Sequence, residues 1–173
     1  MNKFLFLLII VAAVTVVILA PAGCGPYRLG TTLPPHLQTV YVPTFENTTF
    51  EPGIEVDVTD AVITRFRQDG NLRPVSRDQA DTVLEGEITG WNRRVLDYTG
   101  EEENEVEEYR LYVTAVITFR ELATGETLVS NQRVRGYTDF YLEGDLPTAE
   151  EDARPRAFKD LARRIVDQVV SIW

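Results

Sequence analysis

The sequence predicts an α+β fold in which two helices pack on one face of a four-stranded, mostly antiparallel sheet. Two segments carry apolar residues at helical spacing, three long segments alternate apolar and polar residues, and one short apolar strand precedes the first helix. Strands that follow one another through tight turns pair antiparallel, and helices bury their apolar stripes against one face of such a sheet. The elements are therefore expected in the order strand, helix, three strands, helix.

The first strand is expected at about residues 39–42, and a helix follows it. Pro52-Gly53 opens this helix, which runs to Asp69 and stops at Gly70. Its apolar residues recur at four-residue spacing, which predicts one buried stripe made by Ile54, Val58, Val62 and Phe66.

Three long strands are expected next, at about residues 81–95, 109–121 and 127–141, with a turn at 123–126. Each is longer than the five or six residues of an average strand. We therefore expect two of their hairpin ends to extend well beyond a compact core.

Alternation along these strands predicts which side chains share a face. In the first, it places Gly90 with Leu84 and Ile88, and Trp91 on the opposite side with Glu85. The middle strand has one apolar side, made by Leu111, Val113, Ala115, Ile117 and Phe119. The face opposite the helices is half polar, with Tyr112, Thr114, Thr118 and Asn131. An antiparallel face of this kind is either hydrated or a docking surface.

The last element is a helix that we expect to begin near Arg154. Thr148 and Glu151 have the spacing of a capping box, but Pro155 follows, and proline suits the first turn of a helix rather than its interior. A wide apolar stripe then runs to the end of the chain through Phe158, Leu161, Ala162, Ile165, Val166, Val169 and Ile172.

The front of the chain is typical of a secretory signal. Lys3 precedes residues 4–20, which are apolar except for Thr15, and Ala22-Gly23 follow. The sole cysteine, Cys24, comes directly afterwards.

This junction resembles the lipobox of bacterial lipoproteins, in which the cysteine is acylated, although Pro21 stands where an aliphatic residue is usual. Two or more acyl chains such as palmitate hold a protein firmly to a membrane. Gly25 after the cysteine resembles the outer-membrane sorting class. We expect a signal peptide at 1–23, a lipidated tether at 24–37 and one domain at 38–173, anchored to the periplasmic face of a Gram-negative outer membrane.

Charge and residue inventory exclude several classes of function. The net charge of −10 disfavours nucleic-acid binding. The sole histidine, His36, lies in a proline-rich segment without a neighbouring carboxylate in sequence, and no His, Cys and acidic cluster has metal-ligand spacing. We therefore expect no enzyme, no metal and no cofactor.

Residues 32–75 resemble the lipopolysaccharide-assembly lipoprotein family, related to LptE. The shared motifs are LPPH at 33–36, PTFEN at 43–47, TFEPG at 49–53 and DGNLRPV at 69–75. The resemblance implies a two-helix, four-stranded domain that is not an enzyme. Such a domain assists assembly of the LptD β-barrel, plugs its lumen and binds lipopolysaccharide during transport to the cell surface.

Four arginines are candidates for contact with the phosphates of lipopolysaccharide: Arg93 and Arg94 near the end of one strand, and Arg133 and Arg135 on one side of the last. The planar arginine fork donates hydrogen bonds to two phosphate oxygens at once. The alternative is that all four are solvated surface charges. For the whole protein, the alternative is another envelope lipoprotein module, of the curli-secretion or TolB-like kind, without a role in lipopolysaccharide transport.

Overall fold

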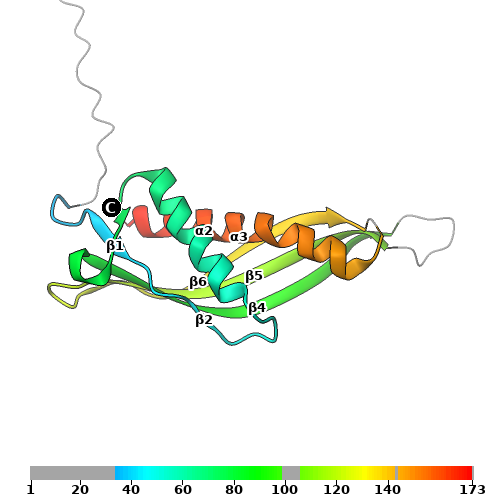
Figure 1. The fold of residues 1–173 in the computed structure, drawn as a ribbon, viewed down its shortest axis with the longest axis horizontal. Helices are drawn as coiled ribbons and strands as arrows, with labels where there is room; N and C mark the ends of the chain where they lie inside the picture. The colour runs from blue at the N-terminus through cyan, green and yellow to red at the C-terminus, as the bar shows by residue number, and fades with distance from the viewer. Residues whose placement is uncertain (1–33, 99–105, 143, 173) are drawn as a thin grey trace, which may run out of the picture. The chain divides into compact units, whose positions relative to one another are not determined.

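The computed structural model describes residues 34–98, 106–142 and 144–172. The expected signal peptide and Cys24 lie outside these residues. The elements are β1 (Thr39–Tyr41), β2 (Glu46–Asn47), α2 (Ile54–Asp69), β3 (Arg73–Pro74), a 3₁₀ turn (Arg77–Gln79), β4 (Thr82–Tyr98), β5 (Val106–Glu121), β6 (Thr127–Tyr141) and α3 (Leu146–Val170). Both helices lie on the same side of one sheet (Figure 1), which confirms the α+β class.

The sheet has six strands, so the prediction of four is wrong. Its order is β3-β1-β4-β5-β6, and β2 also pairs with β4. β4, β5 and β6 form the antiparallel part, whereas β1, β2 and β3 pair in parallel. The two missed strands, β2 and β3, contain two residues each, and two residues are too few to show an alternating pattern.

The core lies between the sheet and the helices. The inner side of β5 is buried from Leu111 to Phe119, as are the apolar stripes of α2 and α3, whereas Ile172, predicted in the stripe of the last helix, lies beyond α3 and is exposed. On β6, Gly136 lies so close to α3 that a methyl group there would overlap the backbone of Leu161. Glycine at this position therefore lets α3 pack directly on β6.

A β-bulge in β4 changes the expected alternation. The pairing with β5 shifts register between Ile88 and Gly90. As a result Gly90 pairs with Thr114, and the half-buried Trp91 packs against the core, with its ring 6.0 Å from that of Phe158. The predicted sides of Gly90 and Trp91 are therefore wrong, because the extra residue reverses the alternation after the bulge.

The last helix begins at Leu146, eight residues before the predicted start at Arg154. The side chain of Asp145 caps it by accepting a hydrogen bond from the Thr148 backbone N–H at 3.1 Å. Pro155 lies inside the helix on its exposed side, where water can reach the carbonyl that proline leaves unpaired. Buried residues on the opposite side, Ala149 and Ala153, attach this first part of the helix to the core.

Among the described residues, no helix combines the length and the apolar character needed to cross a lipid bilayer.

Candidate functional site

The sheet face that the helices leave uncovered carries the candidate site. Residues that lie opposite one another in antiparallel strands share a face, so the register of β4, β5 and β6 gives its rows. From one end, these rows are Glu87, Val116 and Arg133; Gly90, Thr114 and Arg135; Asn92, Tyr112 and Tyr137; and Arg94, Arg110 and Asp139. Arginine and tyrosine thus dominate the part of this face beyond the β4 bulge.

The two tyrosines at the centre of the face form a platform for arginine. The rings of Tyr112 and Tyr137 lie 6.1 Å apart. The guanidinium of Arg135 lies 5.5 Å from the Tyr112 ring, and those of Arg110 and Arg164 lie 4.6 and 5.1 Å from the Tyr137 ring. Cations at this distance are attracted by an aromatic ring, so the platform holds three arginines in position.

Arg110 is fixed by a carboxylate as well as by a ring. Its guanidinium forms two parallel hydrogen bonds with Asp139, the longer at 2.7 Å. These bonds to Asp139 raise the pKa of Arg110 above its ordinary value. Because Asp139 neutralises Arg110, this arginine orders the face rather than offering a free charge.

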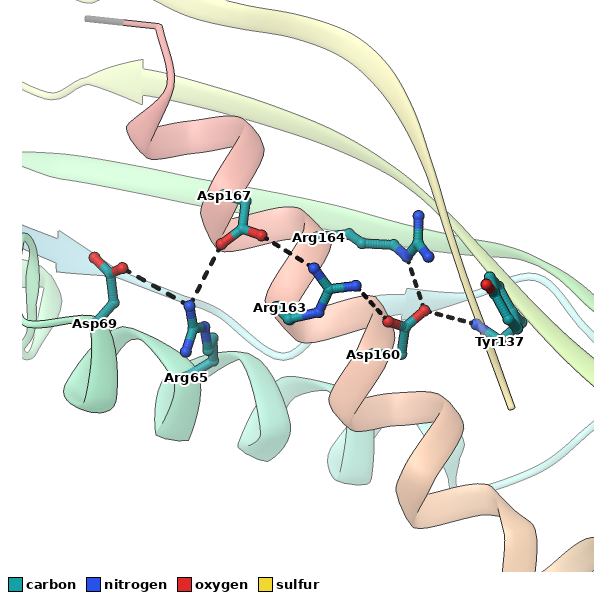
Figure 2. Close-up of polar contacts among 7 residues, drawn as sticks. All are labelled: Arg65, Asp69, Tyr137, Asp160, Arg163, Arg164 and Asp167. Atoms are coloured by element: carbon teal, nitrogen blue, oxygen red, sulfur yellow. Dashed lines mark hydrogen bonds and ion pairs between the residues drawn. The ribbon is translucent and has the colours of Figure 1, made fainter. Parts of the chain in front are cut away.

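A chain of alternating charges joins α2, α3 and β6 (Figure 2). Arg65 of α2 lies 3.9 Å from Asp69 and 3.4 Å from Asp167 of α3. Arg163 then bridges Asp167, at 3.4 Å, and Asp160, at 2.7 Å. The chain ties both helices to each other along their exposed side.

Asp160 ends this chain at the edge of the sheet. One carboxylate oxygen accepts hydrogen bonds from Arg164, at 2.7 Å, and from the backbone N–H of Tyr137, at 3.0 Å. Burial raises the pKa of Asp160, but the hydrogen bonds from Arg163, Arg164 and Tyr137 outweigh it, and the net pKa lies below the ordinary value. Asp160 thus stays charged, and it pairs the Tyr137 backbone N–H, a hydrogen-bond donor on the free edge of β6.

A cationic groove of about 470 Å³ lies between β6 and α3. We call it the arginine groove, after Arg133, Arg135, Arg163 and Arg164 in its lining, where Asp167 is the only carboxylate. Among the described residues, no carboxylate forms an ion pair with Arg133 or Arg135. Arg163 and Arg164 are paired with Asp160, so Arg133 and Arg135 give the groove its local positive charge in a chain whose net charge is −10. This arrangement fits a phosphate-bearing ligand.

A larger hollow, of about 640 Å³, lies between α2 and α3. Its four cationic side chains, Arg65, Arg156, Lys159 and Arg163, are accompanied by the carboxylates of Asp60 and Asp160. Arg65 and Arg163 already belong to the charge chain, and Asp60 offsets one of the two remaining cations. Arg133 and Arg135 of the arginine groove face no unpaired carboxylate in its lining, so we regard the groove as the better anion site despite its smaller volume.

The structure separates Arg93 from Arg94, although both were predicted as phosphate ligands. Arg94 is exposed on the open face, opposite Arg110. Arg93 lies on the helix side, over the Tyr109 ring at 5.7 Å, and pairs with the buried carboxylate of Glu150. Glu150 also accepts a hydrogen bond from the Trp91 indole N–H at 2.9 Å. Arg94 thus shares the open face with Arg133 and Arg135, and Arg93 does not.

Three residues that complete the site, Asp160, Arg163 and Arg164, were not predicted from the sequence. Their spacing of three and four residues on a helix is nevertheless a signal for side-chain pairing. The contact of Arg164 with Tyr137 of β6 had no such signal, because it depends on how closely α3 packs on the sheet.

His36 does have a carboxylate nearby in space, Glu121 at 3.7 Å, which the sequence did not reveal. Within the described ranges, no group of three or more His, Cys, Asp or Glu side chains is placed to hold a metal ion.

Comparison with known proteins identifies the family. The family model described as lipopolysaccharide-assembly, LptE, matches residues 37–169, which include every element from β1 to most of α3. The chain belongs to the LptE family. No curated protein sequence is significantly similar to it.

Solved structures share the LptE-like fold at low sequence identity. A crystal structure of a Xanthomonas campestris protein has a TM-score of 0.56 at 12% identity, covering 78% of this chain and 84% of that one. A minor lipoprotein from Acinetobacter baumannii has a TM-score of 0.51 at 12% identity, with 78% and 94% covered. A hypothetical protein from Chlamydia trachomatis has a TM-score of 0.55 at 10% identity, with 78% and 96% covered. At these identities the likeness concerns the fold alone.

Proposed function

We propose that this LptE-family protein is a lipid-anchored subunit on the periplasmic face of the outer membrane. In this proposal it is not an enzyme. It assists assembly of an LptD-type β-barrel, plugs the barrel lumen and takes part in lipopolysaccharide transport to the cell surface. The observation that carries the proposal is the open sheet face, where Arg135 and Tyr137 are exposed and Arg110 is half-buried on the Tyr137 ring, while the opposite face of the same strands is buried.

Contact with the inner wall of a barrel explains such a face better than exposure to water alone does. Tyrosine and arginine are the residues that contribute most to binding energy at protein interfaces. Here they are already held by ring stacking and by Asp139, so that little side-chain freedom is lost on docking. The wall of a barrel lumen, which is lined by polar side chains, can pair with these groups.

The barrel partnership is tested by affinity purification from outer membranes solubilised in mild detergent. A barrel protein recovered in equal amount with the full-length chain supports the proposal. If no barrel protein is recovered while the chain itself remains folded, the proposed partnership is wrong.

The arginines of the open face and the arginine groove are proposed to contact lipopolysaccharide phosphates. Arg133 and Arg135 lie on both the face and the groove, and Arg94 lies on the face. Arg93 keeps a weaker claim as a ligand, because Glu150 neutralises its charge. The groove could hold a phosphate between Arg133 and the arginines of α3 without disturbing the hydrophobic core.

The lipopolysaccharide proposal is tested by reversing Arg133 and Arg135 to Glu. We expect the binding isotherm for purified lipopolysaccharide to weaken while the melting curve shifts only slightly, since both side chains are exposed and only the stacking of Arg135 on Tyr112 is lost. Reversal of Arg67, an exposed arginine of α2, serves as the control for net charge. Arg94→Glu is tested separately from Arg93, because a Glu at position 93 would face Glu150 and destabilise the fold.

The anchor is tested at Cys24. We propose that this cysteine is acylated, and a palmitate analogue should label the parent chain in living cells but not the Cys24→Ser variant. Equal labelling of both would exclude Cys24 as the acylated residue.

A further inference from the structure

The loop between β2 and α2 presents an aromatic ring to solvent. Phe50, in this loop, has a relative exposure of 104%, the highest among the exposed large apolar side chains of the described residues. Pro52 is also exposed, and Val56 in the first turn of α2 is 53% exposed. Because β2 pairs with β4, the loop continues along the β4 side of the sheet (Figure 1).

The loop is held in this conformation by hydrogen bonds on both sides of Phe50. The Asn47 side chain accepts from the backbone N–H of Thr49 at 3.0 Å and donates to the backbone oxygen of Glu51 at 2.7 Å. It also donates to Glu55 of α2 at 2.9 Å. Thr48 bonds through its backbone N–H to Ile88 of β4 at 3.0 Å.

An ion pair connects the same loop to the second helix. Glu51 lies 3.0 Å from Arg154 of α3, whose guanidinium stacks 5.1 Å from the Trp91 ring. A flexible loop can expose a phenylalanine by chance, and single exposed apolar residues are common. Here the residues on both sides of Phe50, Thr49 and Glu51, are held by hydrogen bonds, while the phenyl ring is fully exposed to water. This preorganisation is typical of an anchor residue at an interface.

The charge around Phe50 determines what kind of surface it can meet. Residues 43–64 contain five carboxylates and no Lys, Arg or His, and Arg154 neutralises only one of the five. Hydrogen bonds, above all from its own backbone and from Asn47, lower the pKa of Glu55, so that this carboxylate stays charged. An anionic lipid surface repels such a loop. A protein pocket with a basic rim attracts it.

We propose that the Phe50 loop is a docking element whose ring enters an apolar pocket on a partner protein, with Lys or Arg side chains at the rim of that pocket. The inference rests on the proposed function in one respect: the partner used in the test is the LptD-type barrel. It adds a contact that the open sheet face does not include.

The test compares the dissociation rates of the purified barrel complex for several variants of the full-length chain. Phe50→Ser should dissociate about 10 to 100 times faster, the effect of losing one buried aromatic anchor, whereas Phe50→Trp should bind nearly as well as the parent. Ile172→Ser, which removes another exposed apolar side chain, is the matched control and should change nothing. Asp57→Lys should weaken the complex, because it places a cation near the basic rim.

A photo-crosslinking phenylalanine analogue at position 50, used in living cells, identifies what the ring contacts. A crosslink to the barrel at an apolar site flanked by Lys or Arg supports the proposal. If the parent complex forms and Phe50→Ser dissociates like the parent, the inference is wrong while the proposed function stands.

If the parent forms no barrel complex, the proposed function fails, and the crosslinker alone decides the inference. A crosslink mapped to an apolar, basic-rimmed site on one identified protein supports it. A lipid adduct alone, or no adduct, overturns it.

Discussion

Asp160 binds three groups from two elements, which makes it the most connected side chain of the candidate site. It bonds Arg163 and Arg164 within α3 and the backbone N–H of Tyr137 on β6. Its side chain is 20% exposed, so solvent screens these bonds only in part. The same residue therefore helps to hold α3 on the sheet, pairs a backbone N–H on the edge of β6 and positions Arg164 over the Tyr137 ring.

We predict that Asp160→Asn lowers the free energy of unfolding at neutral pH by about 1–3 kcal/mol, since an amide leaves the two arginines and the Tyr137 N–H incompletely paired. The measurement is urea denaturation. Asp167→Asn is the control, because Asp167 is 49% exposed and exposed ion pairs contribute about 1 kcal/mol or less. Equal effects of the two substitutions would contradict the special role of Asp160.

Glu150 is the second carboxylate whose loss we expect to matter. It is buried and bonds both Arg93 and the Trp91 indole. We predict that Glu150→Ala destabilises the protein by about 2 kcal/mol, the cost of leaving buried donors without an acceptor. Thermal unfolding measures this change. Glu151→Ala, at the exposed neighbouring position, should shift the unfolding free energy by less than about 0.5 kcal/mol.

At the scale of elements, the sequence was most informative where the repeat of apolar residues along a helix or strand is long and uninterrupted. The predicted bounds of the last strand, 127–141, coincide with β6, and the first helix ends at Asp69 as expected. The bulge before Gly90 was not predictable, since alternation carries no mark of an inserted residue. Adjacent Arg93 and Arg94, by contrast, could have been assigned to opposite faces from alternation alone.

The start of α3 was missed because a local rule competed with tertiary packing. Pro155 removes one helix hydrogen bond, yet Ala149, Glu150 and Ala153 are buried before it. We predict that Pro155→Ala stabilises the protein by about 1–2 kcal/mol: it restores the bond to the Glu151 carbonyl, and the greater freedom of the unfolded chain offsets part of the gain. Pro147→Ala, in the first turn, should gain nothing. The denaturant midpoints of the two variants are compared. An equal gain in stability would mean that Pro155 costs no more inside α3 than Pro147 does in its first turn.

The approach of α3 to β6 depends on Gly136. We predict that Gly136→Val destabilises the protein by at least about 2 kcal/mol, since the new side chain meets the Leu161 backbone, which cannot rotate away. Gly90→Ala is the matched control, because its methyl group meets only the Thr114 side chain, at 3.3 Å. Chemical denaturation distinguishes them, and a small effect of Gly136→Val would mean that α3 can move away from the sheet.

At the scale of the whole molecule, one region of an acidic chain carries a local excess of positive charge. The net charge is −10, yet the arginine groove and the open face gather Arg94, Arg133 and Arg135. The Phe50 loop lies in the opposite kind of environment, with five carboxylates in residues 43–64. This separation allows one domain to meet an anionic ligand and a basic protein surface at different places.

Carboxylates that bind backbone or side-chain donors also make the whole fold sensitive to acid. Hydrogen bonds from Thr39 lower the pKa of Asp81, which joins β1 to the start of β4. The Thr148 backbone N–H lowers the pKa of the helix cap Asp145, and Asp160 has a lowered pKa as described above. Each of these groups therefore binds its proton less readily in the folded chain than in the unfolded one.

We predict that the free energy of unfolding is nearly constant from about pH 8 to pH 5 and falls steeply below about pH 4, where unfolded carboxyl groups begin to take up protons. The stabilisation by Asp81, Asp145 and Asp160 is complete above their unfolded pKa values, and it is lost as the pH falls through their lower folded values. Urea denaturation at successive pH values measures this slope. Asp81→Asn, Asp145→Asn and Asp160→Asn should each make it shallower. If all three variants keep the parent slope, the acid sensitivity must come from charges elsewhere in the chain.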